Sequence, residues 1–238
     1  MNLYSPVMDQ ISELDRFDPV QDPRPADEPW PELIWPISPD TELTGDVVQL
    51  NSIDPTADSA ELFRALDHDD VWSHVPGRPR DPQDFAEILS SRHTLPEWNT
   101  WVVRTRRAIA GLPAGAIVGT SSYLDVSVHD ARLEIGYTLY TPAVWSSSVN
   151  PETKLLLLGH AFDALHAGRV QMKTDTRNHR SQQAIARPGA QYEGTLRRHF
   201  RRSDGTVRDS VIFSVSAEDW PDVRQRLTSR LRSPLSAK

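Results

Sequence analysis

The 238-residue sequence contains no cysteine. This absence excludes a catalytic thiol, a cysteine-ligated metal and any disulfide within the chain, although it does not fix the cellular compartment. No apolar run reaches the roughly 18 residues that a membrane-spanning helix needs, and the N-terminus lacks the basic-then-apolar order of a signal peptide. We therefore expect a cytoplasmic protein.

Motifs for several common chemistries are also missing. None of the eight histidines has the spacing of a zinc site, and no GxSxG, Walker loop or GxGxxG follows an expected strand. We accordingly expect no metal. The net charge of −7 argues against a general nucleic-acid coat, and the 38% hydrophobic content is typical of a globular protein. The length suits one domain with an appendage.

The first 40 residues differ in composition from the rest. They hold eight prolines and nine acidic side chains against two arginines, a composition that does not build an ordinary core. We expect a Pro-rich acidic arm at 1–40, a domain at 41–232 and a short tail at 233–238. Three hydrophobic residues are expected to pack the end of the arm onto the domain: Trp30, Ile34 and Trp35.

Hydrophobic periodicity and turn residues predict the elements around the centre of the domain. Before residue 130 we expect strands at 47–53, 100–105 and 116–126 and helices at 57–66 and 84–89. After residue 190, the pair Asp204-Gly205 predicts a hairpin between 191–202 and 206–216, and 218–231 fits a closing amphipathic helix. Four hairpin residues should share one face: Val207, Val211, Phe213 and Val215.

The stretch from Leu133 to Gly189 is expected to carry the function, because polar residues gather at each of its strand-to-helix junctions. LEIGYTL alternates as a half-buried strand does, and RVQMKTD predicts a second strand that enters beside it after a helical crossover. Pro151 suits the first turn of the crossover helix, and Asn178 opens a second, short helix. The crossover helix should bury four residues at spacings of three and four: Leu155, Leu158, Phe162 and Leu165.

Five segments, in their order and spacing, resemble the GNAT N-acetyltransferases, and in particular the branch that acetylates the amino termini of ribosomal proteins. They are LEIGYTL, WSSSVNPETKLLLLGHAF, KTDTRNHRSQQAIARPGA, YEGTLRRHF and DGTVRDSVIFSV, with a weaker match at TGDVVQL, so the likeness covers about 41–220. The resemblance implies an α+β fold, a central mixed and mostly antiparallel sheet flanked by helices. It also implies acetyl transfer from acetyl-CoA to a primary amine, which is a protein N-terminus or a small amino-acid-like metabolite.

The family binds the pyrophosphate of coenzyme A with a glycine-containing loop, whereas this chain has Trp145-Ser-Ser-Ser-Val-Asn150. Backbone N–H groups before a helix can still bind phosphate, although a position that needs a positive φ becomes costlier without glycine. The resemblance implies these cofactor contacts: Tyr137, Thr138, Leu139, Ser146, Ser147, Ser148, Val149, Asn150 and Asn178. The alternative is a merely structural loop.

Glu134 matches the position of the general base that is proposed in the family, although a glutamate on a strand is often only solvated or salt-bridged. Asn178 and Ser181 match the family's Asn-x-x-Ser. The resemblance implies that Asn178 holds the cofactor arm, a role compatible with capping the helix, and that Ser181 protonates the leaving thiolate. Tyr137 and Tyr192 are alternative proton donors.

Two further groups are candidates for contacts with other molecules. The loop between the first two expected helices walls the acceptor site in the family, and here it offers Trp72, His74, Arg78 and Arg80; it is equally compatible with a solvated loop and one buried tryptophan. An arginine cluster on the hairpin is a solvated face or a site for an acidic peptide, the cofactor's 3′-phosphate or RNA. It comprises Arg197, Arg198, Arg201 and Arg202, with Arg208 across the hairpin.

Two other functions stay open. An aminoacyl-tRNA or another acyl carrier could replace acetyl-CoA as the donor, or the domain could be a non-catalytic binding module. For the assembly, we expect a monomer or a homodimer, because the sheet edges and the long hairpin offer strands that two chains could pair.

Overall fold

The computed structural model describes residues 18–22 and 30–232. The chain divides into two compact units, 1–30 and 31–238, and the account below concerns the second. Most of the expected acidic arm and the expected tail at 233–238 lie outside the described residues. No helix in the described ranges is both long enough and apolar enough to cross a membrane.

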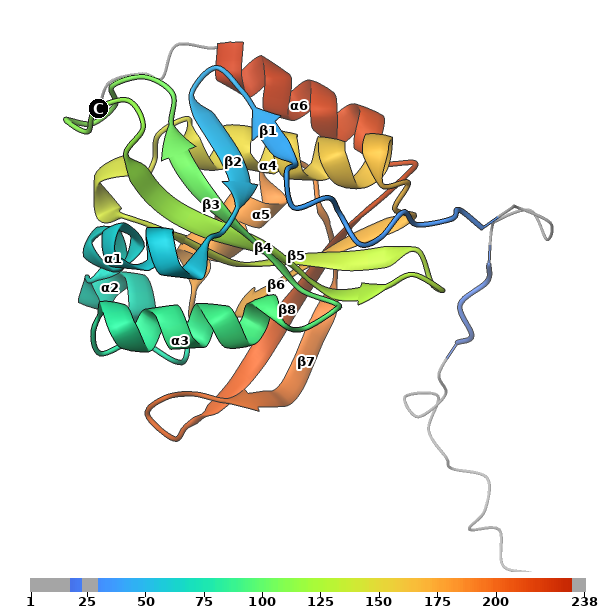
Figure 1. Cartoon of the computed structure of the whole chain (residues 1–238). Coiled ribbons are helices and arrows are strands. Elements are labelled where there is room, and N and C mark those ends of the chain that lie inside the picture. The colour runs from blue at the N-terminus through green and yellow to red at the C-terminus, as the bar shows by residue number, and fades with distance from the viewer. Residues whose placement is uncertain (1–17, 23–29, 233–238) are drawn as a thin grey trace, which may run out of the picture. The chain divides into compact units, whose positions relative to one another are not determined.

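An eight-stranded sheet forms the centre of the described domain, with the strand order β1-β2-β3-β4-β5-β6-β8-β7 (Figure 1). Its strands are β1 (Glu42–Thr44), β2 (Val48–Ser52), β3 (Asn99–Thr105), β4 (Ile117–Ser127), β5 (Arg132–Tyr140), β6 (Arg169–Asp175), β7 (Gln191–Arg201) and β8 (Val207–Ser216). Every pair of neighbours is antiparallel except β5 and β6, which are parallel. The expected mixed, mostly antiparallel sheet is therefore confirmed.

Helices cover both faces of this sheet. They are α1 (Pro55–Leu66), α2 (Asp69–Trp72), α3 (Pro82–His93), α4 (Val149–Gly159), α5 (His179–Ala186) and α6 (Trp220–Arg232). Figure 1 shows α4 and α6 on one face and α1, α2 and α3 on the other, and each group closes its own hydrophobic core. The α1–α3 group covers the first strands, so no helix of that group lies over β7 and β8 in this view.

The central crossover buries a slightly different face from the one expected. Leu157 is fully buried, whereas Leu155 is only partly so. The helix then ends in a π-helical turn, His160–Ala164, in which the N–H of Leu165 donates to the carbonyl of His160. A π turn contains more residues than an α turn, so it changes which side chains follow one another on a face.

In the hairpin, β8 and not β7 lies next to β6, so the order of the strands in the sheet differs from their order in the chain. β6 ends at Asp175, which pairs with Ser210, so the part of β8 before Ser210 has no β6 neighbour. Val211, which pairs with Thr174 of β6, is buried, but Val207, expected on the same face, is 42% exposed. The hairpin tip therefore extends beyond the sheet.

One segment of the expected arm belongs to the packed domain. Leu33 is buried, and the indole N–H of Trp35 donates to the carbonyl of Pro96 at 2.7 Å. Ile34, expected to pack there, is exposed instead, since neighbouring residues of an extended chain point in opposite directions.

Candidate active site

The candidate site lies where β5 and β6 stop pairing with each other. Their parallel pairing covers only 132–134 against 169–171, after which both strands continue without pairing to each other. Leu133 and Ile135 lie in the core beneath α4, so Glu134 between them points to the opposite face of the sheet. Glu134 thus sits at the last paired position, at the mouth of an opening between two strands.

Glu134 is a buried carboxylate, 2% exposed, and one of its oxygens is already bound. Oε2 accepts a hydrogen bond from Nζ of Lys173 at 2.5 Å and one from Nε2 of Gln171 at 3.2 Å. Oε1 accepts no hydrogen bond from any residue that the structure describes. A Cβ at Gly136 would lie 2.8 Å from Oε1, so the glycine leaves this oxygen the room it occupies.

The charge of a second lysine, Lys154, interacts with that of Glu134. Lys154 lies on α4, three and four residues before the core residues Leu157 and Leu158, and is 6% exposed. Burial lowers the pKa of Lys154 to about 8, and the nearby carboxylate of Glu134 opposes that shift. The carboxylate of Glu134 is therefore paired with Lys173 and also interacts with the charge of Lys154.

Asp175, at the end of β6, is buried in an ion pair with the hairpin. Its carboxylate accepts hydrogen bonds from Nε of Arg202 at 2.6 Å, from Nη2 of Arg202 at 2.8 Å and from the N–H of Arg177 at 2.9 Å. Burial alone would raise the pKa of Asp175, but these hydrogen bonds outweigh it and lower the pKa to about 2. Arg202 thus anchors the hairpin to the sheet and has little capacity left for a phosphate.

The hairpin also brings an aromatic ring and a further cation to Glu134. Nζ of Lys173 lies 5.7 Å from the ring centre of Phe200, and the guanidinium of Arg208 lies 5.4 Å from the same ring. Burial lowers the pKa of Arg208, while the charges of Asp175 and Glu134 oppose that shift. Among the described residues, no carboxylate lies within salt-bridge distance of Arg208.

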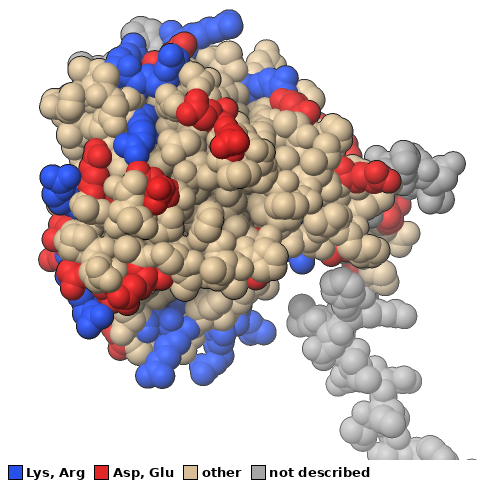
Figure 2. Space-filling view, viewed as in Figure 1, with Lys and Arg blue, Asp and Glu red and all other residues tan. Residues whose placement is uncertain are grey.

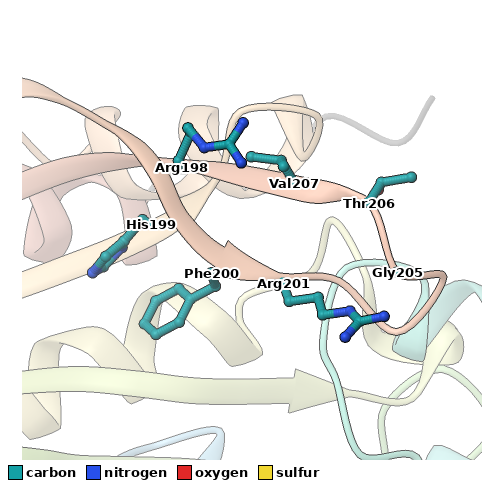
Figure 3. A pocket seen from close by; sticks show the side chains of 7 residues that line it. All are labelled: Arg198, His199, Phe200, Arg201, Gly205, Thr206 and Val207. Carbon is teal, nitrogen blue, oxygen red and sulfur yellow. The ribbon is translucent and has the colours of Figure 1, made fainter.

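A cavity of about 570 Å³ lies at the tip of this hairpin (Figure 3). Its lining comes from β7, β8 and their turn: Arg198, His199, Phe200, Arg201, Gly205, Thr206 and Val207. The same tip carries the basic side chains seen along the lower edge of Figure 2. A bulge near Arg198, whose φ is 52°, shifts the strand register before Phe200. Through Phe200, this cavity adjoins the Lys173–Glu134 pair.

The loop before α4 adopts the conformation that glycine would favour, without glycine. Ser146 has a φ of 61°, Ser147 Oγ accepts from the N–H of Val149 at 3.2 Å, and Ser148 makes no side-chain cap. Asn150 follows in the first turn of the helix. The guanidinium of Arg180, on α5, stacks 3.4 Å from the ring centre of Trp145. The loop thus brings a helix N-terminus and an arginine together, a combination that fits a phosphate group.

The expected cofactor residues of β5 lie just beyond Glu134. Tyr137 has a φ of 49°, and its hydroxyl donates to the carbonyl of Pro76, which ties β5 to the loop after α2. Thr138 bonds Ser121 at 2.7 Å, and Leu139 is buried. The hydroxyl of Tyr137 is therefore already engaged, which weakens its candidacy as a proton donor.

The second short helix starts as the sequence predicts. Oδ1 of Asn178 accepts from the N–H of Ser181 at 3.0 Å and so caps α5. The Ser181 hydroxyl makes no hydrogen bond to any described residue, and it sits in the first turn of α5, beyond the end of β6. Tyr192, the other alternative donor, is 62% exposed on β7, and its hydroxyl lies 3.1 Å from that of Thr195.

The four residues proposed to contact the acceptor do not form one group. Trp72 is a core residue whose indole N–H donates to the carbonyl of Leu66. Arg78 pairs with Asp67 and Asp69, and Arg80 pairs with Asp84.

His74 is the member of that set that interacts with the charges around Asp175. Burial lowers the pKa of His74, Asp175 opposes that shift, and three arginines reinforce it: Arg180, Arg202 and Arg208. The proposed arginine cluster also divides, since Arg202 is bound to Asp175 whereas Arg197, Arg198 and Arg201 are exposed.

Sequence reasoning missed the partners of Glu134, namely Lys154, Gln171 and Lys173. A signal was present for two of them, because polar residues occupy every second position of β6 from Arg169 to Asp175. Lys154 carried a different signal, a charged residue three and four positions before the buried Leu157 and Leu158 of α4. In the described ranges, no group of three or more acidic or histidine side chains is placed to hold a metal ion.

Comparison with known proteins agrees with this geometry. A family model described as the acetyltransferase (GNAT) domain matches residues 48–191, more than half of the chain. A "putative acetyltransferase" of T. thermophilus is 34% identical, with 83% of this chain and all of that chain covered and a TM-score of 0.72. The fold is also that of Mycobacterium smegmatis RimJ, solved in complex with CoA-disulfide, at 21% identity, 85% and 98% coverage and a TM-score of 0.67.

The curated relative is the "uncharacterized N-acetyltransferase YoaA" of Bacillus subtilis (strain 168), which is 27% identical over 99 residues. That match spans 42% of this chain and 55% of the relative, so the chain matches about half of its length. The chain belongs to the GNAT acetyltransferase family. The resemblance found in the sequence is thereby confirmed.

Proposed function

We propose that this enzyme moves the acetyl group of acetyl-CoA directly to a primary amine, with Glu134 as the general base. The main support for this role is that only one carboxylate oxygen of Glu134 accepts hydrogen bonds from the described residues. Two donors hold Oε2, which fixes the carboxylate, while Oε1 is left without a partner among the described residues at the mouth of the opening. A fixed carboxylate with one unoccupied oxygen can take a proton from an amine, directly or through one water.

The same opening offers a place for the acyl donor. Beyond Glu134 the edge of β5 that faces β6 has no strand partner, so its backbone groups are available to an extended amide chain such as pantetheine. The α4 N-terminus, with Ser146 in its left-handed conformation and Arg180 nearby, would hold the pyrophosphate. Acetyl-CoA supplies the thioester carbonyl, and the protein holds it beside the amine.

Acceptor selection would fall to the face of β6, β8 and β7 that carries Lys173, Arg208 and Phe200. Arg208 has no ion-pair partner in the described chain, so an amine that also bears a carboxylate would gain from binding there. A protein N-terminus followed by acidic residues and a small amino-acid-like metabolite both meet this requirement. Cytoplasmic location remains part of the proposal.

Calorimetry and thermal unfolding test the donor. Acetyl-CoA and coenzyme A should bind and raise the melting temperature, because a ligand specific for the folded state stabilises it by mass action. Arg180→Ala should weaken binding of both, whereas Arg80→Ala, at a residue that pairs with Asp84 of α3, is the matched control and should not. No shift at millimolar acetyl-CoA would overturn the proposal.

The exposed arginines of the hairpin support a second candidate, an aminoacyl-tRNA donor. Arg197, Arg198 and Arg201 carry no ion pair among the described residues, and such a cluster attracts phosphates. Binding of tRNA that is lost in the triple alanine variant, together with no binding of acetyl-CoA, would favour this donor. A binding module without catalysis would instead tolerate Glu134→Gln and Ser181→Ala without effect.

We propose a monomer or a homodimer, because β7 lies at an edge of the sheet. Tyr192, Leu196 and Phe200 are exposed large hydrophobic residues on this edge. An unpaired, partly apolar edge can pair with the same edge of a second chain. Sedimentation should give a mass of one or two chains, and a larger mass would count against this expectation.

A further inference from the structure

The side chains of β5 change the face of the sheet to which they point shortly after Glu134. Leu133 and Ile135 belong to the hydrophobic core that includes α4, whereas Leu139 belongs to the core that includes α1, α2 and α3, and Tyr137 packs against that second core. In a regular strand, residues at a spacing of two share one face, so all four would point to the same core. The change of face therefore arises between Ile135 and Tyr137.

A β-bulge lies at this point of the strand. Ser122 of β4 pairs with Gly136, and Thr120, two residues before Ser122, pairs with Leu139, three residues after Gly136. One residue of β5 is thus extra in the ladder. Tyr137 lies in this bulge with a φ of 49°, a value that is unfavourable for a bulky side chain. Such a conformation persists only where the surrounding contacts determine it.

Three segments supply those contacts to the Tyr137 side chain. The hydroxyl donates to the carbonyl of Pro76, in the loop after α2, at 2.9 Å. The guanidinium carbon of Arg92, in the last turn of α3, lies over the ring, 3.8 Å from its centre. The ring of Trp98 approaches edge-on, with the ring centres 5.7 Å apart and an interplanar angle of 62°. A guanidinium at this distance is attracted to the face of an aromatic ring.

Arg92 interacts mainly with aromatic rings. Among the described residues, no carboxylate lies within salt-bridge distance of its guanidinium, and its side chain donates no hydrogen bond. Its other contact is with Trp98, whose ring centre lies 5.5 Å away and whose indole N–H is bound to the hydroxyl of Thr100 at 2.9 Å. The charge of Arg92 is therefore directed at two rings, of which Tyr137 is the nearer.

The bulge lies where β5 offers backbone groups to another molecule. Parallel pairing with β6 ends at Glu134, and the edge of β5 that follows has no strand partner. The dihedral angles of Tyr137 set the orientation of the peptide groups on either side of it, because each peptide group is planar and moves as one unit. Fixing Tyr137 therefore fixes the direction of N–H and C=O groups along this edge.

We propose that Arg92 is a positioning residue for the acyl donor. This rests on the proposed binding of acetyl-CoA along β5. By stacking on Tyr137, Arg92 holds the bulge in the positive-φ conformation, and the unpaired backbone groups of β5 then face the donor. Arg92 acts through Tyr137 and takes no part in proton transfer. The hydrogen bond to Pro76 fixes the other end of the same tyrosine ring.

Amide hydrogen exchange of the ligand-free protein tests the effect on the bulge itself. The amides from Gly136 to Leu139 should exchange at least about fivefold faster in Arg92→Ala, because loss of the contact raises the population of other bulge conformations. Val102 and Val103, in the middle of β3, are the internal reference and should not change. Arg64→Ala, on the exposed side of α1, is the matched control. Equal exchange in the native protein and Arg92→Ala would overturn the proposal.

Calorimetry with coenzyme A tests the consequence for binding. Arg92→Ala should raise the dissociation constant by about 3- to 20-fold, because a smaller fraction of the protein has the competent bulge. Arg92→Lys should raise it less, since lysine keeps the charge but not the planar stack. A purely structural role would lower the melting temperature and leave the dissociation constant of the folded protein unchanged. That result would contradict the proposal.

Substitutions of Tyr137 test whether Arg92 acts through this ring. Tyr137→Leu keeps the Cβ and removes the ring, so it should weaken binding at least as much as Arg92→Ala, whereas Tyr137→Phe keeps the ring and should weaken it less. Glycine adopts a positive φ without strain. In a Tyr137→Gly background, Arg92→Ala should therefore change the dissociation constant by less than about twofold. A further loss as large as that of Arg92→Ala alone would show that Arg92 acts elsewhere.

The outcomes distinguish this inference from the proposed function. If neither acetyl-CoA nor coenzyme A binds the native protein, the proposed function is wrong, and the positioning role is wrong with it. If both bind the native protein and bind Arg92→Ala equally well, the proposed function stands and this inference is overturned. Should Arg92→Ala fail to fold, Arg92→Lys and Tyr137→Phe provide the same comparison.

Discussion

Two glutamates are almost equally buried but differ in their partners, and one of them lies at the proposed active site. Glu152 on α4 is 5% exposed and accepts from the N–H groups of Asp46, Val47 and Val48 at 3.0, 2.7 and 2.7 Å. Glu134 on β5 is 2% exposed and is held by two side chains on one oxygen. Burial alone therefore does not identify a reactive carboxylate.

The nature of the partners separates the two glutamates. Backbone N–H groups cannot titrate or move away, so Glu152 is locked and fastens α4 to the start of β2. Gly45 shows how close this packing is, since a Cβ there would lie 2.4 Å from Cδ of Glu152. Lysine partners can exchange protons, and Glu134 keeps Oε1 for another molecule. Changing each glutamate should accordingly affect different quantities.

The largest effect is expected at Glu134. Glu134→Gln keeps the shape and removes the base, so kcat should fall by ~10²- to 10⁴-fold while acetyl-CoA affinity stays nearly unchanged. Steady-state kinetics with calorimetry of the same preparation measures both quantities. Undiminished turnover would show that the amine arrives neutral or loses its proton to solvent, and catalysis would then rest on positioning the reactants.

Glu152→Gln should change stability instead. The amide group of glutamine turns a donor toward N–H groups, so at least one buried N–H loses its acceptor, and the free energy of unfolding should drop by about 2–4 kcal/mol. Urea unfolding measures it, with Glu32→Gln as an exposed control. A stability equal to that of the native protein would remove the distinction between the two glutamates.

Ser181→Ala should have a smaller effect on catalysis. If the hydroxyl only assists the thiolate, the loss in kcat should stay below about tenfold, because water replaces a hydroxyl more readily than a placed charged group. Steady-state kinetics of Ser181→Ala and Glu134→Gln under the same conditions compares the two losses. A loss in Ser181→Ala as large as that in Glu134→Gln would show that the serine does more than assist the thiolate.

The smallest effect is expected for the pH dependence of stability, at His160 in the core. His160 stacks on Tyr123 with ring centres 5.9 Å apart, and burial lowers the pKa of His160. The unfolded chain therefore binds a proton first as the pH falls, so stability is complete above about pH 6.5 and decreases below it. His160→Phe should flatten this decrease by about 2 °C in melting temperature between pH 6.5 and 5. An unchanged pH dependence would show that His160 does not contribute.

Several elements could be predicted from the sequence because local patterns determine them. The strand at 133–139 is observed as β5, Arg132–Tyr140, and the helix opened by Asn178 is observed as α5, with the cap that its side chain predicts. The expected hairpin at Asp204-Gly205 also forms, but its insertion beside β6 through β8 was not expected. Strand order depends on contacts between distant segments, which periodicity does not encode.

The sequence by itself determined the fold class, the family and Glu134 as the candidate base, because alternation, caps and motif order are local properties of the chain. Only the tertiary structure decided which groups surround that carboxylate. Gln171 and Lys173 of β6 donate to Glu134 where β5 and β6 separate, and the charge of Lys154 on α4 interacts with the same carboxylate. The physical reason is that burial and charge, which set the reactivity of a lysine or a glutamate, depend on neighbours that are distant in sequence and adjacent only in the folded chain.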